Sequence, residues 1–283
     1  MGHVSRKLAS RLDGDKRTLQ HLRNEIAKVQ RRTDWVPDPV HSVYVCAQNL
    51  TSVFAEAVSA APELKPYCDA AAGAEDEYMP SGPPMSPLTG SYFTTWVFFD
   101  LRFGQDLETI GTVLLDVSEQ LRLSSQMFTV IRQFQQTRMG IYEHCGGSAS
   151  RCRLRELITE DEFTCVVPAG YPGREGELWY VRLCPPVAGY DYHVVFTTPY
   201  VLQGTSRADW VAYLERSLNK LTGSDRRARL SHLLKYGQHH NGWNEFVFQA
   251  YAGYESGAVF LAGLPDVPRS LPHADTTGKR RCG

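Results

Sequence analysis

A change of hydrophobic pattern at Met139 constrains the fold more than any other feature of this sequence. From there to Leu202, short apolar or alternating runs follow one another at regular spacing, which is typical of the strands of a small all-β unit. Turn-forming residues, chiefly glycine and proline, separate the runs. We predict five strands: Met139–Cys145, Cys152–Leu157, Glu162–Pro168, Leu178–Cys184 and Tyr192–Leu202. Five short strands with such turns indicate a small antiparallel barrel or curled sheet.

Helical patterns lie on both sides of this region. Leu12, Leu19 and Ile26 fall seven residues apart, so one face of the N-terminal segment is apolar, and we expect that face to pack on the body of the protein. Because Gly14 and Asp15 weaken the pattern, the helix is predicted from Lys16 to Arg31. Further predicted helices are Ser42–Ala61, Ser91–Phe103, Thr109–Val117, Met127–Thr137, Arg207–Leu221, Asp225–Tyr236 and Trp243–Tyr254, and a last strand is predicted at Ala258–Leu264. The fold class is therefore α+β, with N-terminal helices, a central small barrel or curled sheet, and C-terminal helices.

A stretch rich in glycine, proline and acidic residues divides the chain. We read residues 73–87 as a linker or extended loop. The predicted organisation is a basic N-terminal helical region at 1–72, this linker, an α+β domain at 88–264, and a mobile basic tail at 265–283.

Charge is distributed unevenly along the 283 residues, although the net charge is only −1. Residues 1–32 carry a net +6 and residues 269–283 a net +3, which leaves about −10 on the part between them. A basic arm on an acidic body is suited to gripping a protein partner, nucleic acid or the body itself, and a solvated helix face is the plainer interpretation. The arm residues singled out for binding are Lys16, Arg17 and Arg23.

Neither a membrane protein nor a disulfide-stapled secreted domain fits this sequence. No apolar run reaches the length of a membrane-spanning helix, and the first residues form a charged amphipathic segment. The seven cysteines are irregularly spaced, so we expect them to be reduced, in a cytoplasmic protein with no membrane partner.

The sequence predicts no metal, no cofactor and no catalytic residue. His144, Cys145, Cys152, Cys165 and Cys184 are too widely spaced for the close ligand pairs of structural zinc sites, so they are predicted to be core residues. No nucleophile, zinc-protease or phosphate-loop motif occurs. A hydrolase built on His144, Cys165 or His193 is the third-ranked hypothesis.

Two groups of residues are candidates for ligand binding. On the predicted sheet, Arg153, Arg155, Trp179 and Arg182 combine cations with an aromatic ring, as in proteins that read single-stranded nucleic acid. Near the C-terminus, His239, His240, Trp243 and Glu245 gather imidazole, indole and carboxylate groups within seven residues. That cluster suits a ligand site, or else serves only to start the helix that Asn241 caps.

The stretches Tyr92–Phe103, Arg138–Glu143, Leu154–Thr159 and Glu177–Leu183 carry a family resemblance. Over about residues 88–202 the chain resembles the helical and small-barrel region of bacterial proteins of the SEC-C-motif type. The resemblance implies a β-barrel with a helical companion, acting as a metal-free interaction module, and implies no chemistry. The cysteine-rich zinc tail of those proteins is absent here, where only Cys282 lies near the C-terminus.

These features lead to a ranked functional hypothesis. We expect a non-enzymatic interaction or adaptor protein of a bacterial cytoplasm, which binds a partner protein through its basic arm and acidic body. The alternative is a nucleic-acid-binding protein that uses the barrel arginine and aromatic residues together with the arm. The residues predicted to form the core of the 88–202 unit are Trp96, Phe98, Leu154, Leu157, Leu178, Leu183 and Val195.

Overall fold

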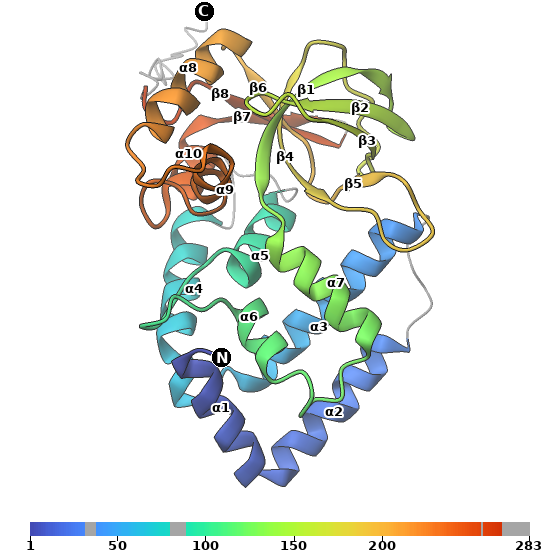
Figure 1. Ribbon diagram of the computed structural model, residues 1–283, viewed down its shortest axis with the longest axis vertical. Helices are drawn as coiled ribbons and strands as arrows, with labels where there is room; N and C mark the ends of the chain where they lie inside the picture. The colour runs from blue at the N-terminus through green and yellow to red at the C-terminus, as the bar shows by residue number, and fades with distance from the viewer. Residues whose placement is uncertain (32–37, 80–88, 256, 268–283) are drawn as a thin grey trace, which may run out of the picture.

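A computed structural model describes residues 1–31, 38–79, 89–255 and 257–267. The architecture is α+β, as predicted: a closed five-stranded barrel lies in the centre of the molecule, with helices at both ends. In Figure 1 the N-terminal helices form the lower half, while the barrel and the C-terminal helices lie side by side above them. No helix in the described ranges is both long and apolar enough to cross a membrane.

Five strands close the barrel in the order β1-β2-β3-β5-β4-β1. They are β1 (Met139–Ser148), β2 (Arg151–Glu156), β3 (Glu162–Val166), β4 (Leu178–Cys184) and β5 (His193–Val195). Every pairing is antiparallel except that of β3 with β5, which is parallel. Because β4 pairs with β1 on one side and is covered on both faces, all seven of its residues are buried.

The fifth predicted strand bends and contributes to two parts of one eight-stranded sheet, the barrel and its extension. Its first half is β5, and after a break at Phe196–Pro199 its second half is β6 (Tyr200–Gln203). At the break, the Thr197 hydroxyl accepts a hydrogen bond from the Arg182 amide, in place of a backbone partner. β6 then leads out of the barrel, pairing with β4 and with β8 (Ala258–Ala262).

The outermost strand corrects one prediction. The helix expected to reach Tyr254 ends at Ala250, and Tyr251–Glu255 forms β7, which pairs with β8. Tyrosine favours an extended chain and Gly253 weakens a helix, so the helical preference of this segment is low. Pairing with β8 therefore makes it a strand.

The N-terminal helices share one apolar core, to which Cys184, Val194 and Phe196 of the sheet region also contribute. They are α1 (His3–Gly14), α2 (Lys16–Gln30), α3 (Pro39–Val58), α4 (Lys65–Tyr78), α5 (Thr89–Phe99), α6 (Ile110–Asp116) and α7 (Ser125–Gln136). Leu8, Leu22 and Ile26 of the basic segment are buried in it, so the segment packs on the body as expected, through apolar contacts. Asp15, which interrupts the heptad pattern, is the N-cap of α2 and accepts from the Thr18 amide at 3.0 Å.

The boundaries in this half differ from the predicted ones. Helix α4 was not predicted, and it continues through Gly73, so residues 73–78 are helical rather than loop. Residues 80–87 of the predicted linker lie outside the described residues. Helices α5 and α7 contribute Phe99 and Phe134, stacked at 4.3 Å, to the same core as α1–α3.

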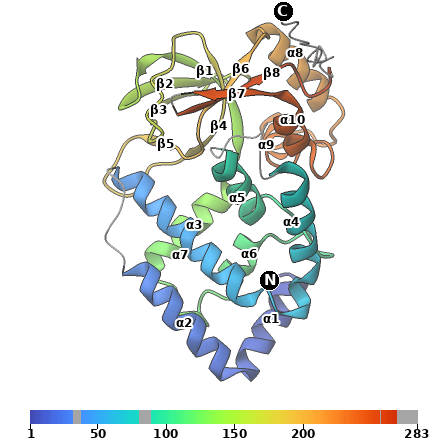
Figure 2. The same cartoon turned by 180° about the vertical axis from the view of Figure 1, so that it is seen from behind.

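The C-terminal helices cover the β6–β8–β7 extension of the sheet. They are α8 (Arg207–Leu218), α9 (Arg226–Tyr236) and α10 (Gly242–Ala250). Figure 2 shows them beside the extension, on the same end of the molecule as the barrel. Of the predicted basic tail, only residues 265–267 are described. All seven residues predicted for the 88–202 core are buried: Trp96, Phe98, Leu154, Leu157, Leu178, Leu183 and Val195. On β2, where buried and exposed residues alternate, the buried Leu154 confirms the predicted register.

A buried ionic cluster joins the three parts. Asp100, after α5, pairs with Arg182 of β4 and, at 2.8 Å, with Lys235 of α9. Arg182 also donates to the Thr137 carbonyl at 3.0 Å. Two cations thus face one carboxylate away from water, and burial lowers the pKa of Lys235 to about 8.

Candidate nucleic-acid interface

The outer face of β2 presents three arginines in a row. Because strand residues alternate, Cys152 and Leu154 point into the barrel and are buried, whereas Arg151, Arg153 and Arg155 point outward. Successive members of the row are two residues apart, about 6.6 Å along a strand. The barrel therefore displays a line of cations at nearly constant spacing.

Arg155, a predicted binding residue, is neutralised by its neighbours. Its guanidinium lies 2.7 Å from the Glu143 carboxylate and 3.5 Å from that of Glu160. Glu143 and Glu160 also both contact Arg207 of α8. Hydrogen bonding to Glu143 raises the pKa of Arg155, so this residue belongs to a surface ion-pair network that ties the barrel to α8.

Arg151 and Arg153 form weaker contacts with carboxylates than Arg155 does. Arg153 donates to the Cys145 carbonyl at 3.1 Å, and no carboxylate of the described chain lies within 4.0 Å of it. The Arg151 guanidinium lies 4.6 Å from the centre of the Tyr192 ring and 3.7 Å from Asp191, whose side chain is 90% exposed. Both arginines therefore keep donors available to an anion.

An exposed aromatic ring stands at the same end of the row. Tyr190 lies in the loop between β4 and β5 and is 43% exposed. Its ring meets that of Tyr192 edge to face at 5.7 Å. Tyr192 in turn donates to Asp38 at 2.9 Å, and burial together with this bond raises its pKa to about 12. Tyr192 is thus a fixed support that holds Arg151 and Tyr190 beside each other.

A shallow depression of about 800 Å³ runs along this face beside the arginines. It is lined by Cys145, Gly146, Gly147, Arg151, Cys152, Arg153, Thr164 and Glu175. At Gly147 (φ +115°) a Cβ would lie 2.4 Å from the Arg151 carbonyl oxygen, so the close approach of β1 and β2 requires glycine. Burial raises the pKa of the Cys145 thiol, which stays protonated at neutral pH.

Two predicted site residues do not reach this surface. Trp179 is fully buried in the barrel, where its Nε1 donates to Glu177 at 3.1 Å. Arg182 is 1% exposed and belongs to the ionic cluster with Asp100. The run Leu-Trp-Tyr-Val-Arg-Leu-Cys is apolar on both faces except for this arginine, which is the pattern of a strand buried on both faces. That pattern is the signal by which Trp179 and Arg182 are recognised as interior residues.

The arm residues lie far from the barrel arginines. Lys16 and Arg17 are exposed at the start of α2, at the end of the molecule opposite the barrel (Figure 1). Arg23 donates to the Gln120 carbonyl at 2.7 Å and so helps to hold α2 on the body. The structure therefore does not combine the arm and the barrel face into one surface.

Most of the groups considered for metal binding or hydrolysis lie on the inner side of the barrel, whereas Cys145 lines the depression on its outer face and Cys184 packs against the helical core. Cys152 and Cys165 face each other across β2 and β3, and Cys165 is opposite His193 across β3 and β5. Burial raises the pKa of Cys165 above its usual range and lowers that of His193, so both stay uncharged at neutral pH. In the described part of the chain, no three His, Cys, Asp or Glu side chains converge as metal ligands.

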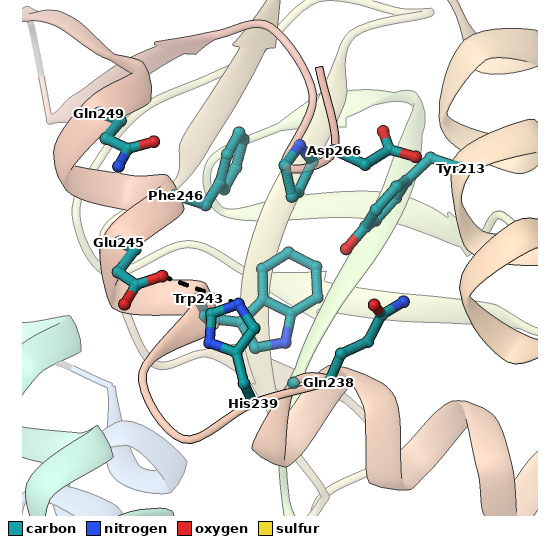
Figure 3. Close-up of a pocket in the computed structure, with 11 residues that line it drawn as sticks. Tyr213, Gln238, His239, Trp243, Glu245, Phe246, Gln249 and Asp266 are labelled. Atoms are coloured by element: carbon teal, nitrogen blue, oxygen red, sulfur yellow. Dashed lines mark ion pairs between the residues drawn. The ribbon is translucent and has the colours of Figure 1, made fainter. Parts of the chain in front are cut away.

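The C-terminal cluster assembles around a separate pocket. His239, Trp243 and Glu245 line it (Figure 3). His240 is exposed and takes no part in the lining. Asn241 is the N-cap residue of α10, although its side chain makes no capping hydrogen bond. The predicted cluster thus forms a wall of a cavity rather than only the start of a helix.

Comparison with known proteins adds no relative: no family model, curated protein or solved structure matches the chain. The SEC-C resemblance stays a prediction.

Proposed function

We propose that the protein binds single-stranded nucleic acid on the outer face of β2. The observation that carries this proposal is the placement of Arg151 and Arg153 on one strand, with exposed Tyr190 at its end. Proteins that hold single strands combine cations that follow the phosphates with aromatic rings on which bases stack. The two arginines suit neighbouring phosphates, and the Tyr190 ring suits one base.

The connectivity of the barrel supports the same surface. The order β1-β2-β3-β5-β4-β1 with β3 parallel to β5 is that of the OB barrel, whose ligands bind at strands 2 and 3 and at the β1–β2 and β4–β5 loops. Arg151 follows the β1–β2 loop directly, and Tyr190 and Tyr192 belong to the β4–β5 loop. Their contact brings the two loops together at one end of the arginine row.

Local charge makes binding depend on a few residues. The central part of the chain is acidic, and Asp191 and Glu175 stand at the rim of the face. Long-range attraction by a large positively charged surface therefore does not explain binding. Contact must come from Arg151, Arg153 and the Tyr190 ring, so removal of these three side chains should abolish binding.

The test is fluorescence anisotropy with a labelled single-stranded oligonucleotide of about 15 nucleotides, over a series of salt concentrations. We expect affinity to fall with salt, and Arg151→Gln with Arg153→Gln to reduce the slope of log K against log[salt] by about 1.4, since each phosphate contact contributes about 0.7. Tyr190→Ala should weaken binding about 5- to 150-fold through lost stacking.

Arg155→Gln is the matched control, because it removes a cation from the same strand whose charge is already paired. It should leave the salt slope nearly unchanged. Absence of salt-dependent binding, or an equal effect of all three arginines, would contradict the proposal. The other predicted function, protein binding through the arm, has less support because α1 and α2 commit their apolar faces to the helical core.

A further inference from the structure

A second cavity, of about 100 Å³, lies beside α10 and shares no lining residue with the depression on the β2 face. Its walls come from three segments: the α9–α10 turn with the first turns of α10, Tyr213 of α8, and Pro265 and Asp266 after β8. Figure 3 shows the Trp243 ring at the back, with Glu245 on one side and Tyr213 on the other. The cavity is too small for a drug-sized ligand, and it accommodates a small charged group or the end of one long side chain.

The aromatic wall of the pocket is rigid. Trp243 donates its Nε1 hydrogen to the Leu233 carbonyl at 2.8 Å, and its ring stacks on Tyr180 at 5.0 Å. Phe246 and Tyr213 meet the same indole edge to face at 6.2 and 6.4 Å. The polar edge of the indole is thus already satisfied, and the rings offer π surface rather than hydrogen bonds to a ligand.

Among the residues that the structure describes, the charged side chains of the pocket are carboxylates, and no lysine or arginine lines it. Asp266 is already paired, since Arg216 approaches it from outside at 2.8 Å. In the described chain, the only ion-pair partner of Glu245 is the His239 imidazole, at 3.7 Å, which is too far for a hydrogen bond. Tyr78 of α4 is also near, since burial and then the Glu77 and Glu245 carboxylates raise its pKa. Glu245 therefore carries the negative charge that a ligand would meet first.

From this geometry we infer that the pocket binds an organic cation, a primary ammonium or a guanidinium group. The cation pairs with Glu245 and lies against the Trp243 and Tyr213 rings, because aromatic faces attract cations most strongly where water is excluded. The amides of Gln238 and Gln249, which also line the pocket, accept the remaining N–H groups. Two carboxylates in the same pocket exclude anionic ligands.

The same chemistry is found in free amines and in lysine or arginine side chains of a peptide. The probes are therefore agmatine and cadaverine for the free form, and a capped peptide with one central arginine for the side-chain form. Isothermal titration of the full chain with each probe distinguishes these sources. Tighter binding of the peptide than of agmatine assigns the pocket to a polypeptide partner, and the reverse assigns it to a metabolite.

Glu245→Gln is the decisive variant, because it keeps the shape of the side chain and removes its charge. We expect about 10- to 100-fold weaker binding of whichever cation binds, as for loss of a charged hydrogen bond. Glu215→Gln is the control, since Glu215 pairs with Arg226 and does not line the pocket. It should bind like the parent protein.

Two further probes complete the test. The probes are pentanol, a neutral analogue of similar length, and glutarate, an anion. Both should bind at least about 10-fold more weakly than cadaverine, because neither can form the charged contact with the Glu245 carboxylate. Failure of all cations to bind at about 10 mM, or equal binding by the Glu245→Gln variant, would overturn the inference. Neither outcome affects the oligonucleotide experiment, which addresses a different surface.

Discussion

Arginines of the same barrel lie in two opposite environments. Arg182 on β4 is buried against Asp100 at the junction of barrel and helices, whereas Arg151 and Arg153 on β2 face solvent. Removing one partner of a buried ion pair leaves an uncompensated buried charge, which lowers the stability of the folded protein strongly. Removing an exposed arginine changes the free energy of unfolding little, because its ion pairs are weak in water. Its N–H donors are therefore available to a ligand. Position in the barrel, and not residue type, separates a structural cation from a binding one.

The largest effect is expected at the junction. Asp100→Ala removes the only carboxylate near Arg182 and Lys235 in the described structure, and should lower the free energy of unfolding by about 3–5 kcal/mol. Denaturant unfolding followed by circular dichroism measures the change. Asp69→Ala, which breaks an exposed pair with Lys65, is the control and should change stability little. A small loss for Asp100→Ala would mean that water reaches the cluster.

The two faces of the β2–β3 pair should differ nearly as much. Leu154 is fully buried inside the barrel, so Leu154→Ala should cost about 2–5 kcal/mol. Thr164, next to Phe163 on β3, points to the outer face, and Thr164→Ala should leave the denaturation midpoint almost unchanged. Similar losses for the two variants would show that the barrel face is covered in solution.

The ionic cluster should give stability a specific pH dependence. The pKa of Lys235 is about 8 in the folded protein, below its ordinary 10.5, so the unfolded chain binds the proton more tightly between these values. Stability contributed by Lys235 is therefore lowest below pH 8 and rises towards pH 10.5, by up to about 1.4 kcal/mol per pH unit.

Buried cysteines and tyrosines titrate in the same range, so the measurement is the difference between the parent protein and Lys235→Met. Unfolding curves at pH 7.5, 8.5 and 9.5, roughly spanning the Lys235 window, provide it. The free energy of unfolding of the parent protein should increase relative to that of the Lys235→Met variant as the pH rises. A constant difference would show that the Lys235 ammonium keeps its ordinary pKa.

The smallest effect on folding is expected on the outer face. Arg151→Gln with Arg153→Gln should change the unfolding midpoint only slightly, because surface substitutions away from caps and cores usually lie within about 0.5 kcal/mol. Thermal unfolding of the double variant measures this. Strong destabilisation would make the arginine row part of the structural frame and would remove the reason to treat it as a binding surface.

Local patterns were sufficient for the barrel strands, for most of the helices and for part of one pocket wall, but not for α4 or β7. Short runs that are apolar or alternate located β1 to β5 and the buried Leu154 and Leu183, because both patterns are encoded by neighbours in sequence. The heptad spacing located α2 and its buried face. His239, Trp243 and Glu245 lie close together in sequence, so their proximity in one cavity wall was also predictable.

Only the tertiary structure determined which charged side chains of these elements form ion pairs and which remain exposed. Asp100 and Arg182 are 82 residues apart, and no local pattern relates them. The pairing of Arg155 with Glu143, the strand at Tyr251–Glu255 and the contact of Arg151 with Tyr192 likewise depend on partners brought close by closure of the sheet. Sequence determines which face of a strand or helix is apolar, because that preference is local. Which charge is buried, paired or left free depends on distances between segments, and these exist only after the chain has folded.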